Sequence, residues 1–261
     1  MSLQKQTKAK PLFPDLLWSR PENKFHAGKL LIVGGNAHAA LAPAQAYMLA
    51  QQAGAGTVKV LLPDALRKTV GKTLEDGEYA PSTPSGSFST QALGELQAMA
   101  NWADGTLIAG DIGRNSETAI LLEKFLEKHV GQVTLTRDAI EYITALPSLV
   151  QHRPDTLAVL SYSQLQRLGT AMHFPMAFSF DITLQRLTDC LRALTEQYKF
   201  SVVTQHLGQT FVASGGQVSS TPIIGPENNP WRLAVATKAS VLWLQNPGQL
   251  FASVSTSLVV D

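Results

Sequence analysis

The sequence predicts an α/β protein with a mainly parallel, doubly wound sheet that is flanked by helices and carries a small antiparallel hairpin at its edge. Short apolar segments alternate with helical segments along most of the chain. Such an alternation favours parallel strands joined by helical crossovers. Two short segments near the C-terminus are also separated by Ser214-Gly215-Gly216, a turn that is typical of a hairpin.

The clearest strand-helix-strand unit lies near the N-terminus. Residues 29–33 are apolar and are followed at once by Gly34-Gly35, which indicates a buried strand that ends in a tight turn. Residues 42–53 form an alanine-rich run that favours a helix, and residues 57–62 resemble a second strand. We therefore expect a βαβ unit with a right-handed crossover here.

The alternation continues toward the C-terminus. We expect strands at 106–109, 133–135, 156–160, 201–204, 209–213 and 217–219, and helices at 117–127, 181–198, 231–245 and 249–259. Asp181 is the expected N-cap of its helix. Residues 81–89 are expected to form a surface loop within a single domain, and the basic stretch Lys5 to Lys10 a solvated, frayed terminus.

The composition narrows the possible partners and the cellular location. The 261 residues are 44% hydrophobic and carry a net charge of +1, which allows a large core and argues against nucleic acid as a partner. No apolar stretch is long enough to predict a membrane helix. Cys190 is the only cysteine and fits the apolar face of the helix 181–198. We therefore expect a core cysteine and a cytoplasmic protein.

Two glycine-rich turns are the candidate ligand-binding positions. Gly34-Gly35-Asn36 follows the first strand, and residues 110–114 follow the strand at 106–109. Ligands of open parallel sheets bind at such strand ends, where glycines allow backbone N–H groups to approach a phosphate and Arg114 adds a bidentate donor. The alternative is that the glycines only form tight turns. The standard phosphate-loop motifs and metal-ligand spacings are missing, so no metal site is predicted.

Several segments resemble one known family in the order in which they occur. Residues 26–28 (HAG) resemble the family's HKG, and residues 53–58 (AGAGTV) resemble its RAGAGLV. Residues 109–114 (AGDIGR) resemble its GPGLGR, with Asp111 in place of a glycine. Residues 134–143 (TLTRDAIEYI) resemble its VLDADALNLL, with Asp138 retained. The family is that of the ADP- or ATP-dependent NAD(P)H-hydrate dehydratases, the YjeF C-terminal domain. The resemblance covers residues 20–261 and leaves residues 1–19 as an N-terminal extension.

The resemblance implies the fold, ligands and site of that family. It implies a ribokinase-like fold of the carbohydrate kinase type, ADP or ATP with Mg²⁺ or an NAD(P)H-type ligand as the bound small molecule, and a homo-oligomer. The ligand-binding candidates that it marks are Gly34, Gly35, Asn36, Gly113, Arg114, Asp138 and Lys238.

The C-terminal half departs from the family pattern. The family's LTPHPGE falls on residues 158–164 without its histidine and glutamate, and its VLKG lysine falls on Gln205. The family's segment MATGGTGDVLAG aligns without gaps with residues 233–244, and its catalytic aspartate then falls on Ser240. In the family this segment begins a helix, where its amides stabilise the transferring phosphate and its aspartate accepts a proton. Lys238 would then either hold an anion there or be a solvated residue of the first helical turn.

Three functional hypotheses follow. The first, which we favour, is a catalytically impaired relative, a pseudoenzyme, that retains nucleotide or dinucleotide binding. The second is an active NAD(P)H-hydrate dehydratase or small-molecule kinase with rearranged residues, for which Asp111, Asp138 and Glu141 are the candidate carboxylates. The third is a structural or assembly protein whose cleft is filled by side chains. Trp243 and Leu244 are the candidates for such filling, and the alternative is that they belong to a repacked core or a subunit interface.

Overall fold

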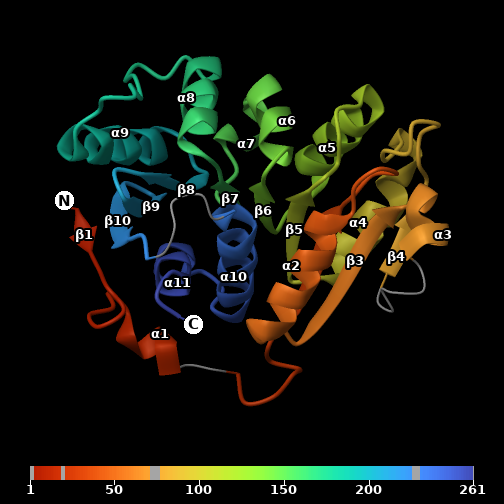
Figure 1. Ribbon diagram of the computed structural model, residues 1–261, viewed down its shortest axis with the longest axis horizontal. Helices are drawn as coiled ribbons and strands as arrows, with labels where there is room; N and C mark the ends of the chain where they lie inside the picture. Colours follow the sequence, from red (N-terminus) through yellow and green to blue (C-terminus); the bar gives the residue numbers. More distant parts are fainter. Residues whose placement is uncertain (1–2, 19–20, 71–76, 225–229, 261) are drawn as a thin grey trace.

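A single ten-stranded sheet runs through the protein. The computed structural model describes residues 3–18, 21–70, 77–224 and 230–260. The strand order is β1-β10-β9-β8-β7-β6-β5-β2-β3-β4, and all described pairings are parallel except the two that β9 makes with β8 and β10 (Figure 1). The strands are β1 (Gln4–Lys5), β2 (Lys29–Gly34), β3 (Thr57–Pro63), β4 (Gly77–Ala80), β5 (Gly105–Gly110), β6 (Gln132–Thr136), β7 (Thr156–Val159), β8 (Ser201–His206), β9 (Gln209–Ser214) and β10 (Gln217–Pro222).

Helices cover both faces of this sheet. One face carries α1 (Pro14–Trp18), α2 (Leu41–Gln52), α10 (Trp231–Gln245) and α11 (Leu250–Ser257). The other carries α4 (Leu93–Trp102), α5 (Ser116–Lys128), α6 (Ala139–Ala145), α7 (Ser148–Gln151), α8 (Tyr162–Ala171) and α9 (Leu184–Gln197). The short α3 (Arg67–Val70) follows β3. None of the helices in the described ranges is long and apolar enough to cross a membrane.

Two apolar cores result from the alternation of side chains along the strands. In β2, Leu31 and Val33 belong to the core under α4 to α9, whereas Leu30 and Ile32 belong to the core under α2 and α10. A strand that is covered on both faces must be apolar at every position. This requirement explains why the central strands are continuous apolar runs in the sequence, and it confirms the predicted fold class.

The predicted hairpin is confirmed, but it does not lie at the very edge of the sheet. Ser214 pairs with Gln217, and Gly215 and Gly216 have φ angles of 54° and 78°, as a two-residue type I′ turn requires. The outer strand β10 is covered by β1, which pairs with it in parallel. The helix α10 has the bounds that the sequence predicts.

Two local predictions at helix and loop positions are wrong. Thr183, and not Asp181, caps α9, because the Thr183 hydroxyl accepts a hydrogen bond from the N–H of Arg186. The loop 81–89 is largely buried and not a surface loop: Phe88 is 2% exposed, and the carbonyl of Gly86 accepts a hydrogen bond from the N–H of Ala37. The loop therefore packs against the turn that follows β2.

The N-terminal segment is docked and not frayed, although its lysines are exposed. Gln6 is 2% exposed, and its Nε2 donates to the Thr221 hydroxyl at 2.9 Å and to the Ser255 carbonyl at 2.7 Å. Its Oε1 accepts a hydrogen bond from the N–H of Leu12. These three hydrogen bonds of the buried Gln6 amide hold the segment against the rest of the protein, whereas the lysines of the stretch had indicated a solvated terminus.

We predict that Gln6→Ala lowers the free energy of unfolding by about 1–3 kcal/mol, because it leaves the buried partners of the amide without hydrogen bonds. Urea denaturation followed by circular dichroism measures this change. Gln4→Ala is the matched control, because Gln4 makes only an exposed 3.4 Å bond to Gln217, and it should shift stability by no more than about 0.5 kcal/mol. Equal effects of the two substitutions would contradict the docking role of Gln6.

Candidate functional site

The two glycine-rich turns meet at the carboxyl ends of β2 and β5. Gly34 pairs with Gly110, the N–H of Gly35 donates to the Gly110 carbonyl at 3.1 Å, and Asn36 Nδ2 donates to the Asp111 carbonyl at 2.6 Å. A Cβ atom on Gly34 would lie 2.5 Å from the Gly110 oxygen. Glycine is therefore needed at position 34 for the two backbones to approach, whether or not a ligand binds there.

Asp111 links this junction to two further elements. Its Oδ2 accepts a hydrogen bond from the N–H of Ala42 at 2.7 Å, in the first turn of α2, where the N-cap residue itself makes no side-chain bond. Its Oδ1 pairs with Arg137 at 2.8 Å, just after β6. The φ angle of Asp111 is 57°, in the left-handed region that aspartate tolerates better than most residues. The side chain that replaces a family glycine thus has a structural role.

Asp138 is held in the same region by backbone contacts. Its Oδ2 accepts a hydrogen bond from the N–H of Gly113 at 3.0 Å, whereas its Oδ1 is buried without a hydrogen-bond partner among the described residues. Burial raises the pKa of Asp138, and the charge of Asp111 raises it further. The predicted candidates Gly34, Gly113 and Asp138 therefore do lie at one end of the sheet.

A network of polar side chains that the sequence did not reveal continues from this point. Gln164, which is 5% exposed on α8, donates from Nε2 to the Arg137 carbonyl at 2.8 Å and to Glu141 at 3.0 Å. Its Oε1 accepts a hydrogen bond from Arg232 at 2.7 Å, in the first turn of α10. Only the capping-box arrangement of Ser161 and Gln164 is visible as a local sequence signal.

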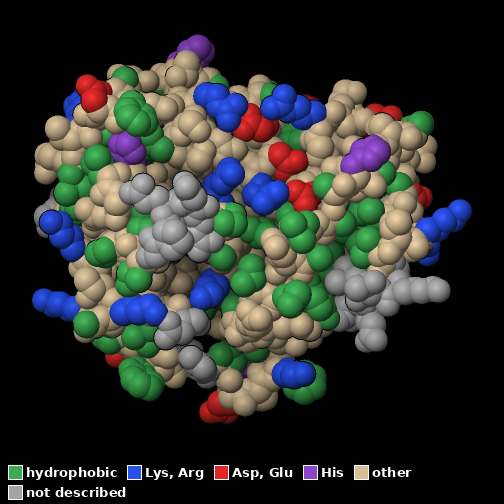
Figure 2. All heavy atoms as spheres, in the orientation of Figure 1, with side chains coloured by type: hydrophobic (Ala, Val, Ile, Leu, Met, Phe, Trp, Pro, Cys, Tyr) green, Lys and Arg blue, Asp and Glu red, His purple; other side chains and the backbone are tan. Residues whose placement is uncertain are grey.

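The charges of the network nearly balance. Arg167 forms a bidentate pair with Glu141, at 2.7 and 2.8 Å. Burial alone would raise the pKa of Glu141, but the hydrogen bonds from Arg167 and Gln164 hold it below its ordinary value. Burial lowers the pKa of Arg232, and the like charge of Arg137 lowers it further. Figure 2 shows basic and acidic side chains side by side in the upper middle of the face that α2 and α10 cover.

The segment that the resemblance places at a helix start lies inside α10 instead. The helix begins at Trp231, so Lys238 lies about two turns and Ser240 about two and a half turns from its N-terminus, and its first turn holds no acidic residue. The buried Ser240 hydroxyl bonds to the Thr134 hydroxyl and to the Ala236 carbonyl, each at 2.8 Å. The expected position of Lys238 in a first helical turn is wrong, and Lys238 does not join the other candidates.

Trp243 and Leu244 do not fill the cleft. Trp243 is 2% exposed, and its carbonyl accepts a bond from Gln132 at the start of β6. A Cβ atom on Gly28, before β2, would lie 2.1 Å from Leu244 Cδ1. Both residues therefore pack in the core at the amino ends of the strands, opposite the carboxyl ends, so the cleft-filling alternative is wrong and the core alternative is confirmed.

The strand ends offer an anion site more readily than a cation site. Arg114 is exposed beside the network, but the two oxygens of Asp111 and those of Glu141 already bind protein donors. Within the described ranges, no group of three or more His, Cys, Asp or Glu side chains is placed to hold a metal ion. Five pockets within these ranges, among others, have walls that do not include Gly34, Gly113 or Asp138. The residues present thus suit a phosphate better than Mg²⁺.

Solved structures share this architecture at low sequence identity. A ribokinase-like superfamily protein from Enterococcus faecalis superposes with a TM-score of 0.75 at 15% identity, over 98% of this chain and 86% of that one. The ADP/ATP-dependent NAD(P)H-hydrate dehydratase from Bacillus subtilis, co-crystallized with ATP/Mg²⁺, gives 0.66 at 12% identity over 99% and 87%. A phosphomethylpyrimidine kinase from Clostridium difficile gives 0.53 at 8% over 88% and 96%.

These similarities establish a ribokinase-like fold, and at such identities they establish the fold alone. No protein-family model and no curated protein matches the sequence.

We predict that Asp111→Ala lowers the free energy of unfolding by about 2–3 kcal/mol, because it removes a helix-capping bond and an ion pair and strains a left-handed residue. Asp111→Asn should cost less than half as much, since asparagine tolerates this backbone and keeps an acceptor. Chemical denaturation compares both with Glu78→Ala, which breaks an exposed pair with Lys59 and should cost at most about 0.5 kcal/mol. A loss for Asp111→Ala as small as that for Glu78→Ala would refute the linking role.

We predict that Asp138→Asn changes how stability depends on pH. Because the pKa of Asp138 is raised in the folded state, its contribution to stability is complete below the unfolded value of about 3.9 and is lost as the pH rises through the folded-state pKa. Asparagine has no such loss, so the variant should gain stability relative to the native protein as the pH rises from about 3 to 7. Urea denaturation across this range tests the prediction, and a pH-independent difference would contradict it.

Proposed function

We propose that this protein is a ribokinase-like pseudoenzyme that binds a nucleotide, ADP or ATP, through its phosphates at the carboxyl ends of the strands. The single observation that carries the proposal is that Arg137 and Arg232 meet at Gln164 at these ends, Arg137 through its carbonyl and Arg232 through its guanidinium. The nearby carboxylates of Asp111 and Glu141 already bind protein donors, and the partner of Asp111 is Arg137 itself. The ribokinase-like fold, which it shares with a dehydratase co-crystallized with ATP/Mg²⁺, supports the choice of ligand.

The arginines favour an anion at this place. Arg232 lies in the first turn of α10, where the free N–H groups and the helix dipole also attract negative charge. Burial lowers the pKa of Arg232 and the like charge of Arg137 lowers it further, whereas the charges of Glu141 and Asp138 raise it. A phosphate between the two guanidinium groups would relieve this repulsion and could accept bidentate hydrogen bonds.

The same residues argue against catalysis. A general base must be free to accept a proton from the substrate. Asp111 is bound to Arg137 and to α2, Glu141 to Arg167 and Gln164, and Asp138 to the N–H of Gly113. Neither Trp231 nor Arg232 at the start of α10 can replace the family's aspartate as a base. Loss of a base alone costs about 10²–10⁴ in rate.

One observation favours the second candidate, an active dehydratase or kinase. The raised pKa of Asp138 and its unpartnered Oδ1 are features that catalytic carboxyls share. However, a Cβ atom on Gly110 would lie only 2.8 Å from that Oδ1, so the oxygen faces the backbone of the β5 turn. We therefore rank this candidate below nucleotide binding without turnover.

The proposal is tested by thermal-shift and calorimetric titrations with ADP, ATP, NADH and NADPH, with and without Mg²⁺. A nucleotide that binds only the folded state should stabilise it by about 2.7 kcal/mol at 100 times its Kd. Arg232→Gln should weaken binding by about tenfold or more, because it removes a charged donor. The matched control is Arg186→Gln on the exposed side of α9, which should bind as the native protein does.

Turnover assays with NAD(P)H hydrate, run on the native protein and on Asp138→Asn, separate the two candidates. The proposal predicts no turnover above background in either protein. Robust turnover that Asp138→Asn abolishes would establish the second candidate instead. A lack of any nucleotide binding by the native protein would refute the proposed ligand.

A further inference from the structure

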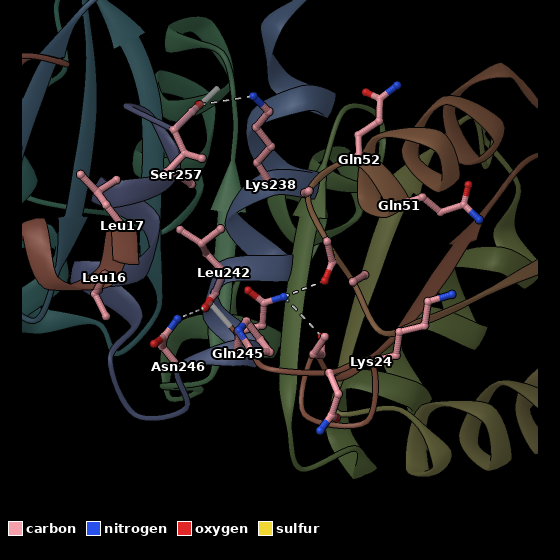
Figure 3. Close-up of a pocket in the computed structure, with 17 residues that line it drawn as sticks. Leu16, Leu17, Lys24, Gln51, Gln52, Lys238, Leu242, Gln245, Asn246 and Ser257 are labelled. Carbon is pink, nitrogen blue, oxygen red and sulfur yellow. Dashed lines mark hydrogen bonds between the residues drawn. The ribbon is translucent and has the colours of Figure 1, made fainter. Parts of the chain in front are cut away.

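A pocket of about 420 Å³ lies at the opposite end of the sheet from the candidate nucleotide site. Its walls come from α1, from the C-terminal end of α2 and from the second half of α10, and they include Ala27 just before β2 and Ala55 just before β3 (Figure 3). The pocket is therefore near the amino ends of the strands. Its volume falls within the range of about 300–1,000 Å³ that small-molecule sites occupy.

The lining combines apolar walls with positive charge. Leu16 and Leu17 of α1 face Leu242 of α10 across the pocket. The charged residues among those that line it are Lys24 and Lys238, and no acidic side chain is among them. The site as a whole therefore attracts a molecule that has an apolar body and carries negative charge.

Most other polar side chains of the pocket are already engaged. Gln245 donates to the Gly54 carbonyl at 2.9 Å and to the Ala27 carbonyl at 3.4 Å, and Asn246 donates to the Leu242 carbonyl at 2.9 Å. These bonds hold α10 against the turns that precede β2 and β3. They leave Lys24 and Lys238 as the charged donors that can respond to a ligand, and of the two Lys238 lies on the same helix as the apolar Leu242.

Lys238 has hydrogen-bonding capacity to spare. An ammonium group carries three donors, and its described bond is one long contact of 3.5 Å to the Val260 carbonyl. Lys238 and Leu242 are one helical turn apart, so both side chains lie on the same side of α10. Figure 3 shows the ammonium of Lys238 above Leu242, with Leu16 and Leu17 to the left.

We propose that this pocket binds an amphipathic anion, with its apolar body against Leu16, Leu17 and Leu242 and its carboxylate or phosphate head on Lys238. The exposed side chains of Trp18 and Phe25, at 86% and 95%, adjoin the lining residues in sequence and add apolar surface to the same segments. The site is independent of the nucleotide site, which uses Arg232 at the other end of α10.

Calorimetric titration of the full chain with octanoate and octyl phosphate tests the proposal, and the two probes distinguish the kind of head group. We expect saturable binding of at least one of them, and much weaker binding of 1-octanol and octyltrimethylammonium, which lack the negative charge. Lys238→Gln should raise the Kd of the bound probe by about tenfold or more, because it removes a charged hydrogen bond.

Two further variants make the test specific. Leu242→Gln keeps the helix and the lysine but removes an apolar wall, and it should also weaken binding by about tenfold. Lys124→Gln, on the exposed face of α5, is the matched control and should bind the probe as the native protein does. Circular dichroism establishes that each variant is folded before it is compared.

The outcomes are distinct from those of the nucleotide experiment. Arg232→Gln should leave octanoate and octyl phosphate binding unchanged, and Lys238→Gln should leave nucleotide binding unchanged. The proposal is overturned if neither anionic probe binds at millimolar concentration, if octanol binds equally well, or if folded Lys238→Gln retains native affinity.

Discussion

The carboxylate of Asp111 holds together the end of the sheet at which ligands of this fold bind. One oxygen caps α2, which follows β2, and the other pairs with Arg137, which follows β6. Three neighbouring strands and one helix are thereby joined through a single residue after β5. A carboxylate that is largely removed from water needs partners to offset its desolvation, so Asp111 depends on both contacts as much as the elements that it joins depend on Asp111. Both oxygens of Asp111 are thereby engaged by protein donors.

The residues of α10 lie in three different environments along the helix. Arg232 faces the polar network at the carboxyl ends, Ser240 and Trp243 are buried against the sheet, and Lys238 lines the pocket at the far side. These roles follow from one helix spanning the sheet from its carboxyl to its amino end. The proposed nucleotide and the proposed amphipathic anion would thus contact the same rigid element without sharing a residue.

The family resemblance succeeded where motifs reflect backbone geometry and failed where it assumed an alignment. Gly34 is needed because Gly110 approaches it closely, so this glycine is a structural requirement of the turn. The match of residues 233–244 to the family's catalytic segment would place Ser240 at a helix start, yet α10 begins at Trp231. A gapless match keeps the spacing between residues along the sequence. It does not determine the residue at which a helix begins.

The sequence by itself determined the alternation of strands and helices and the parallel sheet, but not β1, β4 or α4. These follow from local causes: apolar periodicity, the Gly215-Gly216 turn, and the requirement that central strands be apolar on both faces. Short edge elements such as β1 carried no such signal, because pairing with β10 and the burial of Gln6 depend on residues more than two hundred positions away.

The composition of the site was decided only by the tertiary structure. Arg137, Gln164 and Arg232 come from the end of β6, from α8 and from α10, and the last two are 68 positions apart in the chain. Apart from the capping box that Gln164 forms with Ser161, no local pattern marks them, since each is an ordinary polar residue in its own segment. Their hydrogen bonds and charges act over a few ångströms in space, so folding alone brings them into one network.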